Sequence, residues 1–345
     1  MVPGAFEQVS YGYDEVTGLR TIVALHSTVL GPALGGTRFW DYPDETAALI
    51  DVCRLAQGMT YKHAAAGLDH GGGKAVILGD PTTMRTDSLI LAYGRFVHGL
   101  GGRYLTAEDV GTTQADMDLI RTVTPHVTGV SESLGGSGDP SPATSLGVLW
   151  AMRAVAMRLW GDPSLVDRHV CISGVGKVGG ALADHLHAEG ARLTVSDARR
   201  EATAAVAART GAAVVGITGA HAVPCDIFSP CALGAVLDAR TIPELQCAAV
   251  VGSANNQLAT DHDAERLQHA GVVYVPDYVA NAGGVINIAH EQGGYDRVRA
   301  EEHIRCIYDT VQLVLDLAAA DGLTSAAAAD RVAEARIEQA RNRSS

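Results

Sequence analysis

The stretch that decides the fold is RHVCISGVGKVGGALADHLHAEGARLTVSD, residues 168–197. It predicts a short strand over 168–173, a glycine-rich turn with the spacing GxGxxG, and a helix that continues through Glu189. A second strand over 192–197 then ends in Asp197, a little over twenty residues after the first glycine. This order of strand, GxGxxG turn, helix, strand and acid is the dinucleotide-binding fingerprint in its full context. The stretch therefore predicts a doubly wound α/β domain that binds a dinucleotide.

The glycines of the turn have separate physical roles in this prediction. Gly174 permits the tight turn, Gly176 lets the backbone approach a pyrophosphate, and Gly179 lets the helix pack closely on the strand. The first turn of the helix adds partial positive charge next to the phosphates. Lys177 lies in that turn, where it either faces the phosphates or is simply solvated.

Asp197 indicates which dinucleotide is bound. A carboxylate at this position accepts hydrogen bonds from the adenosine ribose and repels a 2′-phosphate, which favours NAD over NADP. Arg199 and Arg200 follow it directly and weaken that preference.

A linker divides the chain in two. Residues 131–142, SESLGGSGDPSP, are rich in Ser, Gly and Pro, a composition typical of linkers. We predict one α/β domain over residues 1–133 and the doubly wound domain over 134–321. A helical tail from about 322 to 345 is expected to pack back on the first domain.

Hydrophobic patterning predicts the other elements. In the first domain we expect strands at 21–26, 75–78 and 103–107, helices at 44–66 and 87–100, and a glycine-rich loop at 31–38. The N-terminus is expected to lie outside the sheet. In the second domain we expect a helix at 144–160 and further strands at 212–215, 225–229, 248–251 and 272–275, which gives a sheet of six strands.

Composition excludes several functional classes. The chain of 345 residues carries a formal charge of −13 and no basic stripe, so a nucleic-acid partner is not expected. It has no apolar run of 18 residues and no signal peptide, so we expect a cytoplasmic protein without a membrane partner. The six cysteines form no CxxC pair and there is no HExxH motif, so reduced thiols and no metal site are expected.

Lysine is scarce, with three residues against twenty-three arginines. Arginine does not give up its proton in a protein, whereas a desolvated lysine can. Lys62 and Lys74, which lie in or beside small-residue motifs, are therefore candidates for a catalytic amine pair. A Walker A motif at Lys74 is excluded, because Leu68 stands where it requires glycine and Ala75 where it requires Ser or Thr.

Several motifs resemble those of the glutamate, leucine, phenylalanine and valine dehydrogenase family, over nearly the whole chain. The matching stretches are Gly31–Arg38, Gly58–Lys62, Ala66–Leu68, Gly71–Lys74, Thr106–Thr112, the GxGxxG unit and Val279–Val285. The resemblance implies an NAD-dependent L-amino acid dehydrogenase that acts on a small molecule and forms a homo-oligomer. It also implies that the first domain binds the substrate and carries the oligomer contacts.

The resemblance assigns roles to three catalytic candidates. Lys74 would be the general base that activates water, Lys62 would bind the substrate carboxylate, and Asp109 would assist proton transfer. A lysine base must be neutral near the working pH, far below the usual pKa of about 10.4, and burial beside a second cation would lower it. The alternative for Asp109 is a hydrogen bond to backbone at a helix start.

The resemblance also implies the binding residues. The substrate residues would be Leu34, Gly35, Gly36, Met59, Lys62, Ala107, Asn281, Val285 and Ile288. The NAD residues would be Thr144, Gly174, Val175, Gly176, Lys177, Val178, Gly179, Asp197, Ser253, Ala254, Asn255 and Asn281. Asn281 would hold the substrate amine or the cofactor amide, the alternative being a plain helix cap.

Three positions bear on the choice of substrate. Glutamate-specific relatives carry a lysine and a serine where this chain has Leu34 and Ile288, so a second carboxylate would be left unpaired and rejected. Val285 stands where phenylalanine-specific relatives have a smaller residue, which favours a branched-chain substrate, Leu, Val or Ile, that the sequence does not rank. Two alternatives stay open: an aromatic amino acid dehydrogenase, and a non-catalytic NAD-sensing protein on the same scaffold.

His63 departs from the family pattern. Relatives usually have asparagine directly after the lysine at position 62. The histidine either titrates and tunes the lysine pair or is a neutral hydrogen-bonding substitute.

Overall fold

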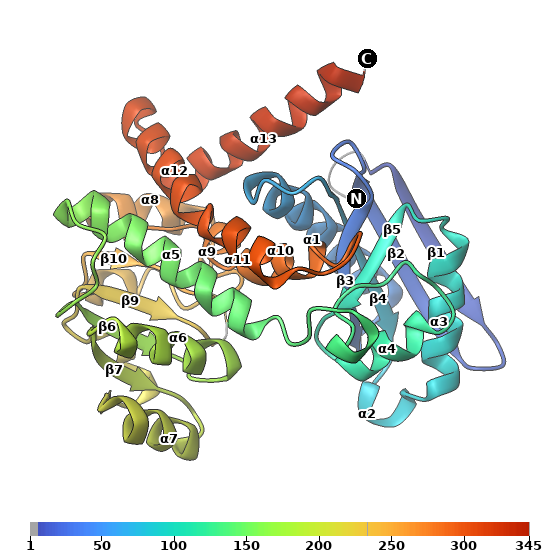
Figure 1. The fold of residues 1–345 in the computed structure, drawn as a ribbon, viewed down its shortest axis with the longest axis horizontal. Helices are drawn as coiled ribbons and strands as arrows, with labels where there is room; N and C mark the ends of the chain where they lie inside the picture. The colour runs from blue at the N-terminus through green and yellow to red at the C-terminus, as the bar shows by residue number, and fades with distance from the viewer. Residues whose placement is uncertain (1–5, 233, 345) are drawn as a thin grey trace. The chain divides into compact units, whose positions relative to one another are not determined.

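The computed structural model describes residues 6–232 and 234–344 (Figure 1). Its contacts divide the chain into two compact units. The first unit comprises the chain up to Asp139, the segment Asn287–Arg297 and the chain from Ala333 onward. The second comprises Pro140–Ile286 and Val298–Val332.

The segment Asn287–Arg297 corrects the predicted division of the chain. We predicted that it belongs to the second domain, but its contacts place it in the first unit. Its Glu291 carboxylate accepts hydrogen bonds from the backbone N–H of Gly129, at 3.0 Å, and of Ser137, at 2.9 Å. The break between Asp139 and Pro140 falls inside the predicted linker, a few residues after the boundary we expected.

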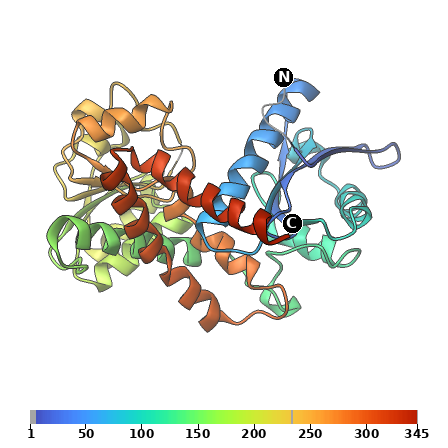
Figure 2. The same ribbon diagram turned by 90° about the horizontal axis from the view of Figure 1, so that it is seen from above.

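The first unit is built on a five-stranded mixed sheet. Its strands are β1 (Gln8–Asp14), β2 (Leu19–Ser27), β3 (Ala33–Trp40), β4 (Gly71–Leu78) and β5 (Tyr104–Glu108), in the order β1-β2-β4-β3-β5. Helix α1 (Glu45–Ala65) buries Val52 and Ala56 against one face of the sheet. Helices α3 (Asp87–Gly99) and α4 (Gln114–Arg121) pack on the other face, and α2 (Pro81–Met84) is a single turn. Figures 1 and 2 show α1 and α3 on opposite sides of this sheet.

Three predictions for this unit were wrong. Residues 31–38, expected to be a loop, mostly form β3, which lies between β4 and β5. The N-terminal segment was expected outside the sheet, but its described residues Gln8–Asp14 form the edge strand β1. The glycines of 71–73 belong to β4, so Lys74 lies within a buried strand instead of at its end.

The second unit has the predicted doubly wound sheet. Its six strands are parallel and run in the order β11-β10-β9-β6-β7-β8. They are β6 (His169–Ser173), β7 (Arg192–Ser196), β8 (Ala213–Val214), β9 (Ile227–Pro230), β10 (Ala249–Val250) and β11 (Val273–Tyr274). The strand order reverses between β6 and β9, which is the switch point where such sheets bind ligands.

Helices α5 to α13 complete the chain. Those of the second unit are α5 (Ser141–Trp160), α6 (Lys177–Ala188), α7 (Arg200–Thr210), α8 (His262–His269), α9 (Asp277–Ala280) and α12 (Ile307–Asp321). Segments of α10 (Gly283–Ala289), α11 (Arg297–Arg305) and α13 (Ser325–Ser344) fall in both units.

Within the described ranges, no single helix is long and apolar enough to cross a membrane. The bent pair Arg297–Asp321 and Ser325–Arg343 meets the criterion of length and composition when taken together.

Two glycines of the turn after β6 differ in how tightly their surroundings are packed, and this difference can be tested. A Cβ at Gly179 would lie 2.0 Å from the carbonyl oxygen of Gly174, whereas a Cβ at Gly176 would meet only an Arg199 nitrogen, at 3.7 Å. We expect G179A to lower the free energy of unfolding by about 1 to 3 kcal/mol through overpacking. G176A is the matched control and should unfold like the wild type. Thermal denaturation followed by circular dichroism compares them, and equal midpoints for all three proteins would contradict this account.

Candidate active site

One face of the first unit's sheet gathers several predicted site residues. Side chains alternate along a strand, so Leu34 and Gly36 of β3 lie on the same face. Gly36 pairs with Ala107 of β5, and Lys74 of β4 lies next to it, because Thr37 pairs with Ala75. Val76, on the same face as Lys74, packs in the core beneath α1. These residues therefore face α1.

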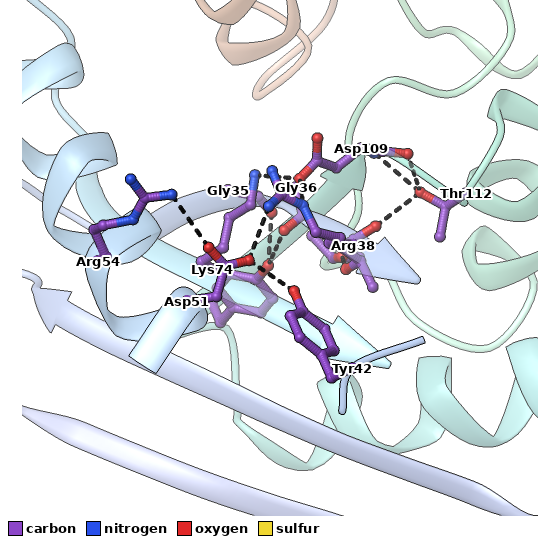
Figure 3. Close-up of polar contacts among 12 residues, drawn as sticks. Gly35, Gly36, Arg38, Tyr42, Asp51, Arg54, Lys74, Asp109 and Thr112 are labelled. Carbon is purple, nitrogen blue, oxygen red and sulfur yellow. Dashed lines mark hydrogen bonds and ion pairs between the residues drawn. The ribbon is translucent and has the colours of Figure 1, made fainter. Parts of the chain in front are cut away.

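An ion pair occupies the end of this face. The Lys74 Nζ lies 2.7 Å from Oδ2 of Asp109, the first residue after β5, and only 9% of the lysine side chain is exposed. Arg38 Nε lies 3.4 Å from the same carboxylate oxygen (Figure 3). The absence of a side chain at Gly36 leaves room for Asp109, since a Cβ at Gly36 would lie 2.8 Å from the Cβ of Asp109.

The two cations decide the charge of Asp109. Burial raises the pKa of this carboxyl, but the charges of Lys74 and Arg38 outweigh it and leave the pKa below its ordinary value. Asp109 is therefore a carboxylate at neutral pH, able to accept a proton from the amine that it contacts. Its backbone N–H donates to Thr112 Oγ1 at 3.0 Å, which fixes the turn.

Arg38 and its partners are residues that the sequence analysis missed. Arg38 Nη1 donates to Asp51 Oδ2 at 2.8 Å, and the Tyr42 hydroxyl donates to the same oxygen at 2.7 Å (Figure 3). Arg38 ends the glycine motif Gly31–Arg38, so its position in a motif was a usable signal. Asp51 gave no signal, because a single acid on an amphipathic helix is usually solvated.

Helix α1 brings Lys62 toward the start of β4. Lys62 is half-buried in the last turn of α1, and Met59, also half-buried, lies one turn earlier. Thr60 lies so close to β4 that a Cβ at Gly72 would be 2.1 Å from its Oγ1. A direct effect of Lys62 on Lys74 stays a prediction.

His63 is a neutral hydrogen-bond donor. Its ring is fully buried, and Nδ1 lies 2.7 Å from the carbonyl oxygen of Gly71. A carbonyl only accepts, so Nδ1 carries the hydrogen. Burial lowers the pKa of His63 to about 3, mainly through desolvation. Of the two alternatives for this residue, the structure supports the neutral hydrogen-bonding role.

The glycine turn of the second unit is tied to Asp197. Gly174 has φ +100, and a Cβ on it would lie 2.7 Å from the backbone nitrogen of Ala232. Asp197 accepts hydrogen bonds from the backbone N–H of Val175 and of Arg199, each at 2.9 Å. Burial raises the pKa of Asp197, but the hydrogen bonds from these donors lower it by more, so the net shift is downward.

The loops at the carboxyl ends of the strands lie side by side. Cys231 N–H donates to Ser173 at 2.7 Å, and Ala254 N–H donates to Pro230 at 3.0 Å. The loops after β6, β9 and β10 are therefore neighbours at the edge where a dinucleotide binds in such sheets. Lys177 is exposed and Val178 is half-buried in the first turn of α6.

Asn281 presents a buried acceptor at this edge. Its Nδ2 donates to the Ser253 carbonyl at 3.1 Å and to Asn255 Oδ1 at 2.8 Å, and because a backbone carbonyl only accepts, the bond to Ser253 fixes the amide orientation. Its Oδ1 is buried and has no hydrogen-bond partner among the described residues. A buried polar atom is normally satisfied, so Asn281 fits a ligand that donates an N–H, such as the carboxamide of a nicotinamide.

The remaining predicted residues lie on α5 and α10. Thr144 of α5 is close to α10, since a Cβ at Gly284 would be 2.4 Å from its Oγ1. Val285 is buried in the second unit, whereas Ile288 is half-buried and belongs to the first. Most substrate candidates thus lie in the first unit, whereas the NAD candidates lie in the second, together with the substrate candidates Asn281 and Val285.

In the described parts of the chain, no three His, Cys, Asp or Glu residues are grouped in a way that could hold a metal ion.

The burial of His63 predicts acid sensitivity with a defined sign. The unfolded chain binds a proton at histidine below about pH 6.5, whereas the folded pKa is about 3. As the pH falls from about 6.5 to about 3, this residue should therefore lower the free energy of unfolding by up to about 1.4 kcal/mol per pH unit. H63N keeps an amide donor without titrating, so its stability should depend less on pH in this window. Urea denaturation at pH 7 and pH 5 compares the two, and an unchanged slope would contradict a neutral buried His63.

Comparison with known proteins assigns the family. Residues 7–126 match the model of the Glu/Leu/Phe/Val dehydrogenase dimerisation domain, and residues 135–212 and 197–303 match that of the Glutamate/Leucine/Phenylalanine/Valine dehydrogenase domain. The chain is 49% identical to a leucine dehydrogenase of Bacillus cereus, covering 98% of this chain and 92% of that protein. It is 50% identical to a valine dehydrogenase of Streptomyces coelicolor, covering 99% and 94%. The crystal structure of an L-tryptophan dehydrogenase from Nostoc punctiforme superposes with a TM-score of 0.87 at 40% identity, covering 98% and 97%. This chain therefore belongs to the Glu/Leu/Phe/Val dehydrogenase family.

Proposed function

We propose that this protein catalyses the reversible NAD-dependent oxidative deamination of a branched-chain L-amino acid to the 2-oxo acid and ammonia. The observation that carries the proposal is the ion pair between Lys74 and Asp109 on a buried sheet face of a unit that the family model matches. The glycine turn and the unsatisfied oxygen of Asn281 support NAD binding in the other unit. The identity to leucine and valine dehydrogenases supports the substrate class.

The proposed residues divide the chemistry between them. Bound NAD would supply the acceptor for the hydride on Cα of the amino acid, and loss of that hydride would leave an imine on the substrate. Lys62 holds the substrate carboxylate by charge. Lys74 takes a proton from the water that adds to the imine carbon, and Asp109 exchanges that proton with the lysine amine. Lys74 returns the proton to the amino nitrogen. The C–N bond then breaks as the added hydroxyl gives its proton to Lys74 and becomes the carbonyl, so that ammonia leaves and the 2-oxo acid remains.

Substrate selection is proposed to depend on apolar side chains. Leu34 is fully buried on the same sheet face as Lys74, and Ala107 is buried beside it. A carboxylate held against such side chains would lose its hydration without gaining a partner. A substrate with an aliphatic side chain carries no such cost.

The family also bears on assembly and on location. We infer that the protein is a homo-oligomer, because the model that matches its first unit describes a dimerisation domain. We also infer that it works in the cytoplasm on small molecules, in keeping with its likeness to leucine and valine dehydrogenases.

A substrate panel tests the proposed reaction. NADH formation at alkaline pH is measured with leucine, valine, isoleucine, phenylalanine, tryptophan and glutamate. We expect the highest kcat/KM with an aliphatic substrate, and differences of about 1 to 3 kcal/mol among the three aliphatic ones. Preference for phenylalanine or tryptophan would instead favour the aromatic alternative, in line with the likeness to the tryptophan dehydrogenase. Activity with glutamate alone would contradict the apolar pocket, and NAD binding without any turnover would favour a sensor.

The two lysines should fail in different ways. K74A should lower kcat by about 10²- to 10⁴-fold, the usual contribution of a general base, and should still bind NAD. K62A should mainly raise KM for the amino acid. Steady-state kinetics with NADH binding by fluorescence separates these effects. R20A removes an exposed surface ion pair of the same unit and serves as the control, because such pairs contribute little. Near-normal turnover in K74A would remove Lys74 from the mechanism.

A further inference from the structure

The last part of α13 lies against the end of α1, the helix that carries Lys62. Arg336 Nη1 donates to three carbonyl oxygens there: Leu68 at 2.8 Å, His63 at 3.1 Å and Ala64 at 3.2 Å. Its Nη2 donates to Asp69 Oδ1 at 2.9 Å. One guanidinium therefore binds the whole turn that leads from α1 toward β4.

These bonds have a clear physical basis. The last carbonyl groups of a helix lack partners within the helix and carry partial negative charge. A guanidinium offers five N–H donors in a rigid fork and stays protonated in proteins. Only 26% of the Arg336 side chain is exposed, so its bonds are partly shielded from water. Burial lowers the pKa of Arg336, and the Asp69 carboxylate opposes that shift.

The same helix contacts both neighbours of Lys62. The Tyr61 hydroxyl lies 3.0 Å from Glu334 Oε1, and the backbone of His63 accepts from Arg336. The His63 ring in turn donates to Gly71, at the start of the strand that carries Lys74. The backbone on either side of Lys62 is therefore held both to α13 and to β4.

We propose that Arg336 is a positioning residue for Lys62, acting through the end of α1 without contact with the substrate. The inference rests on the proposed role of Lys62 as the carboxylate anchor. Displacing a binding group by about 1 Å can cost up to about a hundredfold in catalysis. Loss of Arg336 should therefore appear as weaker use of the amino acid, with NAD binding unchanged.

The test compares two arginines of the same helix. R336A should raise KM for the amino acid about tenfold or more and leave the dissociation constant of NADH as in the wild type. R331A removes an arginine of α13 that pairs with the exposed Asp321 instead of with α1, and it should leave both constants unchanged. R336K keeps the charge but not the fork, so it should also raise KM, by a smaller factor, in a protein with less disturbed packing.

A double-mutant cycle separates positioning from a general structural role. If Arg336 acts through Lys62, R336A should add little to the KM of K62A. Equal fold increases in the K62A and wild-type backgrounds would overturn the proposal, as would unchanged KM values in both R336A and R336K. Failure of the proposed function would look different, since the wild type would then oxidise no amino acid or K62A would show an unaltered KM.

Discussion

The close approach of β5 to β3 at Gly36 is the constraint on which the site depends. A Cβ at this position would lie 2.6 Å from the carbonyl oxygen of Glu108 and 2.8 Å from the Cβ of Asp109. Any side chain would push the chain after β5 away from β3 and separate Asp109 from Lys74. Gly35 is restricted in the same way, because a Cβ there would lie 1.8 Å from the carbonyl oxygen of Gly73. The absence of a side chain at Gly35 therefore lets β4 lie close to β3 on its other side.

Positive and negative side chains alternate in a series of ion pairs on this sheet face. Lys74 pairs with Asp109, Asp109 with Arg38, and Arg38 with Asp51 on α1. Buried ion pairs are expensive to desolvate and are often no more stabilising than apolar residues of the same volume. Stability alone therefore does not explain four charged groups here, whereas a carboxylate held ionised next to a lysine amine is useful for moving a proton.

The sequence predicted the second unit better than the first, for a physical reason. The order of strand, GxGxxG, helix and Asp197 is local, and a doubly wound sheet follows from repeating that unit. In the first unit, Gly35 and Gly36 looked like a loop because glycine has low strand propensity. These two glycines form a strand because β3 pairs with β4 on one side and with β5 on the other, and both of those strands are far away in sequence. Arg38 and Asp51 were missed for the same reason, because their pairing depends on the tertiary fold.

The order of the chain segments has a consequence for folding during synthesis. The first unit needs three segments, and the last of them begins at Ala333. The last segment of the second unit ends directly before it, at Val332 in the same helix. Domains usually fold from the N-terminus during translation, but here both units receive their last segment from α13. The first unit, although its sheet is synthesised early, therefore stays incomplete until Arg336 binds the end of α1.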